Sequence, residues 1–278
     1  LESVGQKSIN NIVDATNYVM LDTGQPLHAF DAGKLNARDE AYALAVRGAE
    51  SGEQLLALDD KTYALAEDAL VIADAADEVV SIAGIKGGKP TGIDEGTKSI
   101  ILEAANWDGA TIRKTATALK LRTDASDRFQ QGISPELAAY GLRAAADLIV
   151  SIAGGSIEGY VDEYPAPVPA RSVSVSLAKI NGVLGTTLAT SDVADVFTRL
   201  DLPYDQKGET FEVRIPFERL DLEIPEDLVE EVGRIVGYET IPATELPLDS
   251  ARGKPPEVNP HFYAAEKKRE KLVQQGYS

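Results

Sequence analysis

The sequence predicts an α+β fold: a mixed, β-rich first domain with helices, followed by a small winged-helix-like α+β domain. Three observations support this. Short segments rich in Val, Ile, Leu and Ala alternate with longer helical patterns, a proline-rich connector divides the chain at "DEYPAPVPARS" (162–172), and 278 residues fit two domains. Hydrophobic residues make up 44% and charged residues 26% of the chain, as in ordinary globular proteins.

Residues 1–165 form the predicted first domain. Four segments are strand-like: "YALAVRGA" (42–49), "ALVIADA" (69–75), "VVSIAGI" (79–85) and "SIILEAANW" (99–107). "DGATIRKTATALKL" (108–121) predicts a helix with Asp108 as its cap. "SPELAAYGLRAAADLIVSIAGG" (134–155) predicts a longer helix, capped by Ser134 and closed by two glycines.

Residues 170–243 form the predicted winged-helix-like domain. The pattern gives a strand leading into a helix (171–185), a helix capped by Thr190 or Ser191, a hairpin (204–216), and a helix that starts at Pro225. Residues 244–278 are expected to begin a further, truncated domain. The chain starts without methionine and stops within a helix-like pattern, so we expect a fragment of a longer protein.

The charge balance limits the possible partners. With 45 acidic and 27 basic residues, the net charge is −18, which repels phosphate backbones at long range. A DNA-binding role for the winged-helix-like domain is therefore disfavoured, and an RNA substrate would need positive surface from another protein. No apolar run reaches the roughly 20 residues that cross a bilayer. The absence of cysteine suits a cytoplasmic location, which is our prediction.

Three features are candidates for function. His28, in "QPLHAFD", is one of only two histidines, although a lone histidine is more often structural than catalytic. The loop "AGIKGGKPTG" (83–92) lacks the spacing of a phosphate-binding loop, because Pro90 follows Lys89. In "RLDLEIPEDLVEEVGR" (219–234) several carboxylates gather near a helix start, which either the helix dipole or a magnesium site explains.

Four segments together resemble the β subunit of bacterial phenylalanyl-tRNA synthetase. They are "INNIVDATNYVMLDTGQPLHAFDAGKL" (9–35), "IAGIKGG" (82–88), "TDASDRFQQGI" (123–133) and "DLVEEVGRIVGYETIP" (227–242), and they occur in that family's order. The resemblance implies that the first domain is the tRNA-editing domain. That domain hydrolyses tyrosine wrongly attached to the tRNA for phenylalanine.

The resemblance also assigns roles to individual residues. His28 and Asn17 are implied as catalytic residues of the editing pocket, and Glu103, Gly84 and Thr16 as substrate-binding residues. A buried carboxylate at Glu103 would recognise the tyrosine hydroxyl, because phenylalanine leaves that carboxylate unpaired. We expect His28 to orient the ester or the attacking water, with no covalent nucleophile.

The family further implies a metal, a cofactor and partners. Asp221, Asp227, Glu230 and Glu231 would offer carboxylates to a magnesium ion shared with the α subunit, in a heterotetramer of two α and two β subunits. The whole enzyme uses ATP to attach phenylalanine to its tRNA, whereas this chain has no ATP-binding motif. Two positions depart from the family's usual residues: Lys86 replaces methionine in the glycine loop, and Gln130 replaces glutamate.

Two alternatives to an editing fragment are open. Lys86 places a charge near the recognition loop. One alternative is therefore a non-catalytic scaffold for subunit assembly, whose editing pocket has lost its activity. A free-standing hydrolase related to the editing domain alone is the other, and the attached winged-helix-like domain argues against it.

Overall fold

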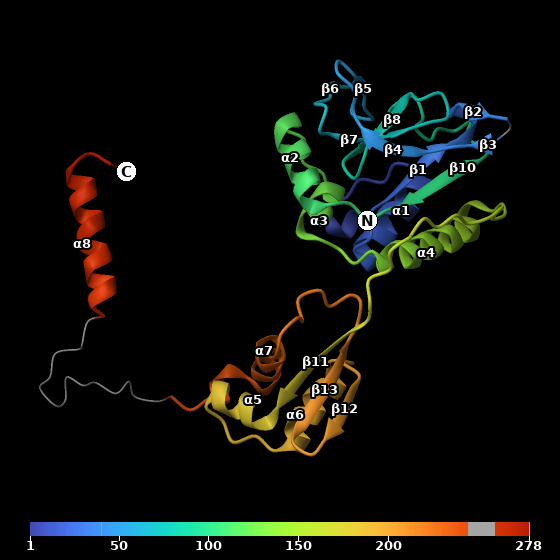
Figure 1. The fold of residues 1–278 in the computed structure, drawn as a ribbon. Coiled ribbons are helices and arrows are strands. Elements are labelled where there is room, and N and C mark those ends of the chain that lie inside the picture. Colours follow the sequence, from blue (N-terminus) through green and yellow to red (C-terminus); the bar gives the residue numbers. More distant parts are fainter. Residues whose placement is uncertain (40, 244–258, 278) are drawn as a thin grey trace, which may run out of the picture.

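The computed structural model describes residues 1–39, 41–243 and 259–277. It confirms the predicted α+β class, since helices and several small antiparallel sheets share the chain (Figure 1). Within these described residues, no helix has the length and apolar character that a membrane span requires.

The first part of the chain contains ten strands and four α-helices among its described residues. The strands are β1 (Leu27–Asp31), β2 (Ala37–Arg38), β3 (Ala41–Tyr42), β4 (Ala45–Gly48), β5 (Gln54–Leu56), β6 (Thr62–Ala64), β7 (Leu70–Ala73), β8 (Val79–Ile82), β9 (Lys86–Gly87) and β10 (Ile100–Ala104). The helices are α1 (Asn11–Thr23), α2 (Gly109–Leu119), α3 (Asp124–Gln131) and α4 (Glu136–Ala153), with 3₁₀ turns η1 (Glu2–Val4) and η2 (Ala32–Lys34).

Two antiparallel sheets position the candidate residues. β1 pairs with β10, and a separate sheet has the order β4-β7-β8-β9. Phe30 of β1 and Ile101 of β10 pack with Ile72 and Val80 of the second sheet and with Ala83 just after β8, so one face of the β1–β10 ribbon is turned toward that sheet. Helix α1 packs against both α4 and β1.

The helix caps confirm one prediction and correct another. Asp108 caps α2, its carboxylate accepting a hydrogen bond from the Thr111 amide at 2.8 Å. Ser134 does not cap α4: the N-cap position is Pro135, and the Leu137 amide bonds to the carbonyl oxygen of Ser134 instead of its hydroxyl. Gly154 ends α4 with a positive φ of 76°, as the glycine pair predicts.

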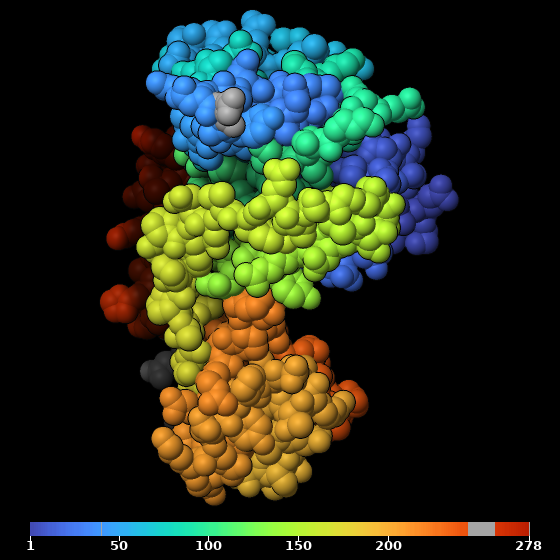
Figure 2. All heavy atoms as spheres, turned by 90° about the vertical axis from the view of Figure 1, so that its right-hand side faces the viewer, coloured from blue at the N-terminus to red at the C-terminus, as the bar shows by residue number. Residues whose placement is uncertain are grey.

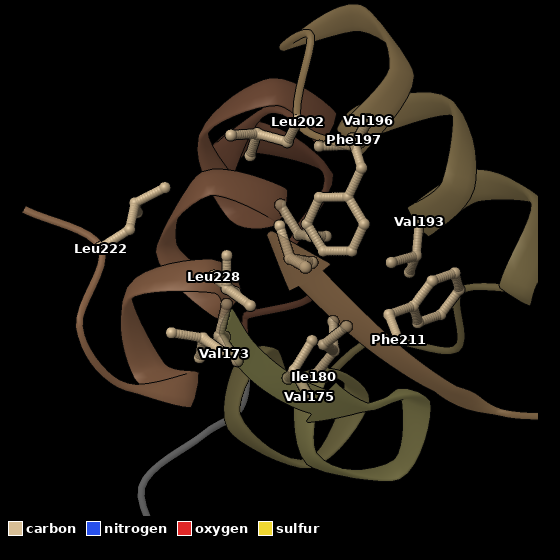
Figure 3. Packing of buried hydrophobic residues seen from close by; sticks show 13 residues of the cluster. Val173, Val175, Ile180, Val193, Val196, Phe197, Leu202, Phe211, Leu222 and Leu228 are labelled. Carbon is tan, nitrogen blue, oxygen red and sulfur yellow. The ribbon is translucent and has the colours of Figure 1, made fainter. Parts of the chain in front are cut away.

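The second part folds around its own core. Its elements are β11 (Arg171–Ser176), α5 (Leu177–Leu184), α6 (Thr190–Arg199), β12 (Tyr204–Lys207), β13 (Thr210–Ile215), α7 (Pro225–Val236) and η3 (Tyr238–Thr240). The three strands form an antiparallel sheet in the order β11-β13-β12. Figure 3 shows Val173 and Val175 from β11 packing with Phe197 from α6 and Phe211 from β13, all of them buried.

The predicted hairpin and the helix that starts at Pro225 are confirmed as β12–β13 and α7. The predicted cap of α6 is wrong, because Thr190 and Ser191 lie inside the helix and Ala189 occupies the N-cap position. The Asp192 carboxylate bonds back to the Ala189 amide at 2.8 Å and so completes the helix start.

The connector joins the first part of the chain to the second, and the last segment follows the second part. In Figure 2, α4 and the connector form a continuous yellow-green band above the orange second part. The expected third domain, 244–278, falls largely outside the described residues. Of that range the structure describes 259–277, in which the exposed helix α8 (Pro260–Gln274) lies.

Candidate functional site

The candidate site is centred on one cross-strand pair of the β1–β10 ribbon. His28 of β1 lies directly opposite Glu103 of β10 in the antiparallel register. Directly opposed residues project to the same face, with Cβ atoms about 4.5–5.5 Å apart. The fold therefore brings together two predicted site residues that are far apart in the sequence.

Both side chains of this pair are removed from water to an extent that changes their titration. Burial raises the pKa of Glu103 to about 7 and lowers the pKa of His28 to about 4, because each uncharged form is favoured away from water. At neutral pH the imidazole is uncharged, and the carboxyl is about half protonated. Perturbed titratable groups of this kind concentrate at functional sites.

The His28 ring packs against Phe30 and has one ring nitrogen without a partner among the described residues. Its ring packs edge-on against Phe30, with centroids 4.5 Å apart and planes at 89°. The Nε2 atom is buried and has no hydrogen-bond partner among the described residues. A buried polar atom without a partner costs free energy unless a ligand or water supplies one, so Nε2 would gain from a hydrogen bond to a substrate that reached it.

Gly87 makes the position of the His28 ring possible. A Cβ atom built on Gly87 would lie 2.3 Å from Cε1 and 2.5 Å from Nε2 of His28, closer than real Cβ contacts come. The predictions from sequence name Gly84 and not Gly87. The only sequence signal for Gly87 is that it lies in a glycine-rich segment. The sequence does not indicate which glycine of that segment contacts His28, because this depends on the turn before β9.

Gly84 occupies the turn between β8 and β9, with φ of +67°. A Cβ atom there would lie 2.6 Å from the Trp107 ring and 3.1 Å from both Ile112 and Phe129. Among the described residues its amide forms no backbone hydrogen bond. Gly84 thus has a clear packing role, and its predicted part in hydroxyl recognition stays a prediction.

Thr16 and Asn17 are carried by α1, the helix that packs against β1. Thr16 is buried, and its hydroxyl donates to the Val13 carbonyl oxygen at 2.8 Å. No hydrogen bond joins either residue to His28 or Glu103 in the described part of the chain. Their predicted contacts with substrate stay predictions.

Gln25 is a buried residue that the sequence analysis does not single out. Its side-chain amide donates to the carbonyl oxygens of Pro26 and Ala105, both at 2.9 Å. Those two bonds join the start of β1 to the end of β10, two residues beyond Glu103. Gly141 of α4 leaves the room for it, since a Cβ there would lie 2.7 Å from Gln25. Gln25 therefore supports the pairing that opposes His28 to Glu103.

Lys86 does not bring its charge to His28. Residues 86 and 87 are adjacent in β9, so their side chains point to opposite faces, and the Gly87 face meets His28. The Lys86 ammonium instead lies 3.9 Å from the Asp59 carboxylate, which also accepts a 2.8 Å hydrogen bond from the Tyr63 hydroxyl. The Lys86 charge is thus accommodated away from the candidate site.

The four predicted magnesium ligands are engaged differently. Arg219 forms a two-point contact with Asp221, at 2.7 and 2.9 Å, and a 3.0 Å contact with the buried Glu231. Asp227 accepts amide hydrogen bonds at the start of α7, and Glu230 is exposed. The described residues contain no group of three or more His, Cys, Asp or Glu side chains placed to hold a metal, so they do not fit a complete magnesium site.

Two cavities of the described chain lie elsewhere. One, of about 350 Å³, lies between α1 and α4 and is mostly apolar. The other, of about 510 Å³, is lined by residues from 23–24, 131–137 and 218–221. Neither is lined by His28 or Glu103, both of which are half-buried.

Comparison with known proteins agrees with the two-part fold. Residues 1–154 match the B3/4 domain family, and residues 173–238 match the tRNA synthetase B5 domain. The first match covers more than half of the chain, which therefore belongs to the B3/4 domain family. Both matches fall inside the predicted ranges 1–165 and 170–243.

The similar curated proteins are phenylalanine–tRNA ligase β subunits, as the four motifs predict. A Bacillus cereus relative is 38% identical over 98% of this chain and 32% of its own length. One from Streptococcus pneumoniae is 42% identical over 90% and 30%, and one from Geobacter metallireducens is 38% identical over 100% and 34%. The chain thus spans about a third of these relatives, and its predicted kinship with that subunit is confirmed.

A solved N-terminal fragment of the phenylalanyl-tRNA synthetase β subunit from Pyrococcus horikoshii is also similar. It is 14% identical, with 80% of this chain and 64% of that chain covered and a TM-score of 0.40. A likeness of that size supports no further argument.

Proposed function

We propose that residues 1–165 form a proofreading site that hydrolyses the ester between tyrosine and the tRNA for phenylalanine. The observation that carries the proposal is the opposed pair of His28 and Glu103, both desolvated and on one face of the β1–β10 ribbon. In the reaction, water adds to the ester carbonyl carbon, and the ribose hydroxyl leaves with a proton.

Glu103 accounts for selectivity toward tyrosine. With its pKa raised to about 7, its carboxyl both donates to and accepts from a phenolic hydroxyl near neutral pH. Phenylalanine in the same place leaves a desolvated carboxyl without a partner, at a cost of roughly 1–3 kcal/mol. That free energy corresponds to about fivefold to 150-fold discrimination from this one group.

His28 acts on the reacting end of the substrate. An uncharged imidazole with a free Nε2 can donate to the ester carbonyl oxygen or accept from the attacking water, according to its tautomer. A pKa of about 4 makes it a weak base, which supports orientation of the water over full proton abstraction. Asn17 and Thr16 on α1 are the proposed further contacts.

Deacylation measurements with single variants test this proposal. Glu103→Ala should slow the release of tyrosine and leave the slow release of phenylalanine little changed, whereas His28→Ala should slow both. Gly87→Ala should act like His28→Ala, because its methyl group displaces the ring; Gly182→Ala, which meets open space, is its control. Unimpaired removal of tyrosine by Glu103→Ala would refute the recognition role.

The activity of the whole enzyme is a separate part of the proposal. As part of a phenylalanine–tRNA ligase, the chain would work with an α subunit, in an assembly of two α and two β subunits, and with the tRNA for phenylalanine. ATP would serve the synthetic reaction elsewhere in the enzyme, in the cytoplasm. Any magnesium held by Asp221, Asp227, Glu230 and Glu231 would require Arg219 to release its carboxylates.

A second candidate function is a scaffold for subunit assembly with a lapsed pocket. It is favoured by one observation: the His28–Glu103 face lines neither of the two cavities described above. Equal and negligible release of tyrosine and phenylalanine by the assembled enzyme would support the scaffold over the proofreading site.

A further inference from the structure

A basic surface segment lies beside the candidate site. Residues 109–123, "GATIRKTATALKLRT", contain four basic residues and no acidic one, in a chain whose net charge is −18. The segment consists of α2 and the turn that follows it (Figure 1). Arg113, Lys114, Lys120 and Arg122 are all exposed.

The charges on this segment are not explained by the stability of the helix. The helix dipole favours cations at the C-terminal end of a helix. Arg113 and Lys114 lie in the middle of α2, more than one turn from that end. Neither has an acidic residue three or four positions away on the helix. In the described part of the chain Arg113, Lys114 and Lys120 form no salt bridge, whereas Arg122 pairs with Asp127 at 2.7 Å.

The opposite face of α2 is fastened to the turn that borders the candidate site. Ile112 is buried against Gly84, where a Cβ would come within 3.1 Å of it. At the other end of the segment, the Thr123 hydroxyl donates to the Ile85 carbonyl oxygen at 3.1 Å. Two residues further along, Gly87 meets the His28 ring. The basic face and the His28–Glu103 pair are therefore joined through the short segment 84–87.

We infer that the exposed face of α2, led by Arg113 and Lys114, binds the phosphate backbone of the RNA whose aminoacyl end enters the site. This inference rests on the proposed function and names the surface that delivers the substrate. Unpaired cations on a helix face are suited to phosphates, and their effect is local, so it operates despite the acidic chain as a whole. An acidic protein surface is the rival partner for the same cations.

The test measures binding and turnover separately. The double variant Arg113→Glu/Lys114→Glu is compared with Arg38→Glu/Lys98→Glu. The control makes the same change of charge at two exposed residues of the first part that form no described salt bridge. Arg38 lies on β2, at the other end of the first part from α2 in Figure 1. Binding of transcribed tRNA for phenylalanine is followed by fluorescence anisotropy at low salt, without any need for hydrolysis.

We expect the α2 variant to bind the tRNA about tenfold more weakly or worse, with a shallower dependence of log K on log salt, and the control to bind as the parent does. In deacylation the α2 variant should raise KM and leave kcat unchanged, because His28 and Glu103 are untouched. Arg113→Gln/Lys114→Gln, which removes the charges without reversing them, should give a smaller loss of the same kind.

Two outcomes would overturn the inference, and a third would overturn only the proofreading proposal. An equal loss in the α2 variant and the control would mean that only overall charge matters. Unchanged tRNA binding by a correctly folded α2 variant would remove RNA as the partner, and a simultaneous loss of α-subunit binding would assign the face to protein. If no variant or parent chain hydrolyses tyrosyl-tRNA but binding falls as expected, the proofreading proposal fails while the RNA surface stands.

Discussion

Replacing Glu103 by glutamine should change how stability depends on pH. Burial raises the pKa of Glu103 from 4.5 to about 7, so the folded state binds more protons than the unfolded state between those values. Stability therefore falls as pH rises through that window, and the full cost is present above pH 7. At about 1.4 kcal/mol per pKa unit, this cost is about 3 kcal/mol.

His28 has the opposite trend. Its pKa is lowered from 6.5 to about 4, so the folded state binds fewer protons there and stability rises with pH between those values. The two trends oppose each other in the parent chain. Glu103→Gln removes only the loss of stability with rising pH that Glu103 causes. Between pH 4 and pH 8 the unfolding free energy of the variant should therefore rise by about 3 kcal/mol relative to that of the parent.

Urea unfolding followed by tryptophan fluorescence measures this difference. Trp107 is the only tryptophan of the chain and packs with the core of the first part, so its emission reports unfolding of that part alone. Glu95→Gln, at an exposed carboxylate, is the control and should show no such shift. A difference between Glu103→Gln and the parent that stays constant from pH 4 to pH 8 would refute the assignment of a desolvated carboxyl.

Three further predictions concern stability. Gly84→Ala should destabilise the first part by about 1–3 kcal/mol more than Gly52→Ala, because both have positive φ but only the first lacks space for a methyl group; urea unfolding compares them. Lys86→Met should change stability by less than about 1 kcal/mol, since its ion pair is long, and should leave the rate of tyrosine release unchanged in the deacylation assay. Arg219→Met should lower the thermal stability of the second part by about 1–3 kcal/mol in calorimetry, because the buried Glu231 loses one of its two arginine partners; an unchanged transition would contradict this.

Local patterns predict much of this fold. The hairpin β12–β13 and helix α7 follow from a turn signal and from proline at a helix start, which depend on neighbouring residues only. Helix α1 is not assigned by those patterns, because its Ile, Val, Thr and Asn residues have modest helix propensity and packing on α4 and β1 stabilises it. The predicted cap at Ser134 is wrong by one residue, because a local pattern places the end of a helix only to within one or two residues.

The candidate site is less predictable, because its geometry is set by long-range pairing. Pairing of β1 with β10 opposes His28 to Glu103 across 75 positions, and the buried Gln25 amide supports that pairing without any local signal. The acidic cluster shows the reverse problem. Its carboxylates are evident in the sequence, but Arg219 in the same segment competes for two of them, and only the structure shows the contacts.

Selective hydrolysis by the unmodified chain is the most direct test of the proposal that residues 1–165 form a proofreading site. Tyrosine and phenylalanine esters of the same tRNA are offered separately, first to the chain alone and then to the assembled two-subunit enzyme. The value of kcat/KM is measured for each ester. Tyrosine should be released at least about fivefold faster than phenylalanine, the effect of a single unpaired carboxyl. Equal release of the two amino acids in both preparations would contradict it.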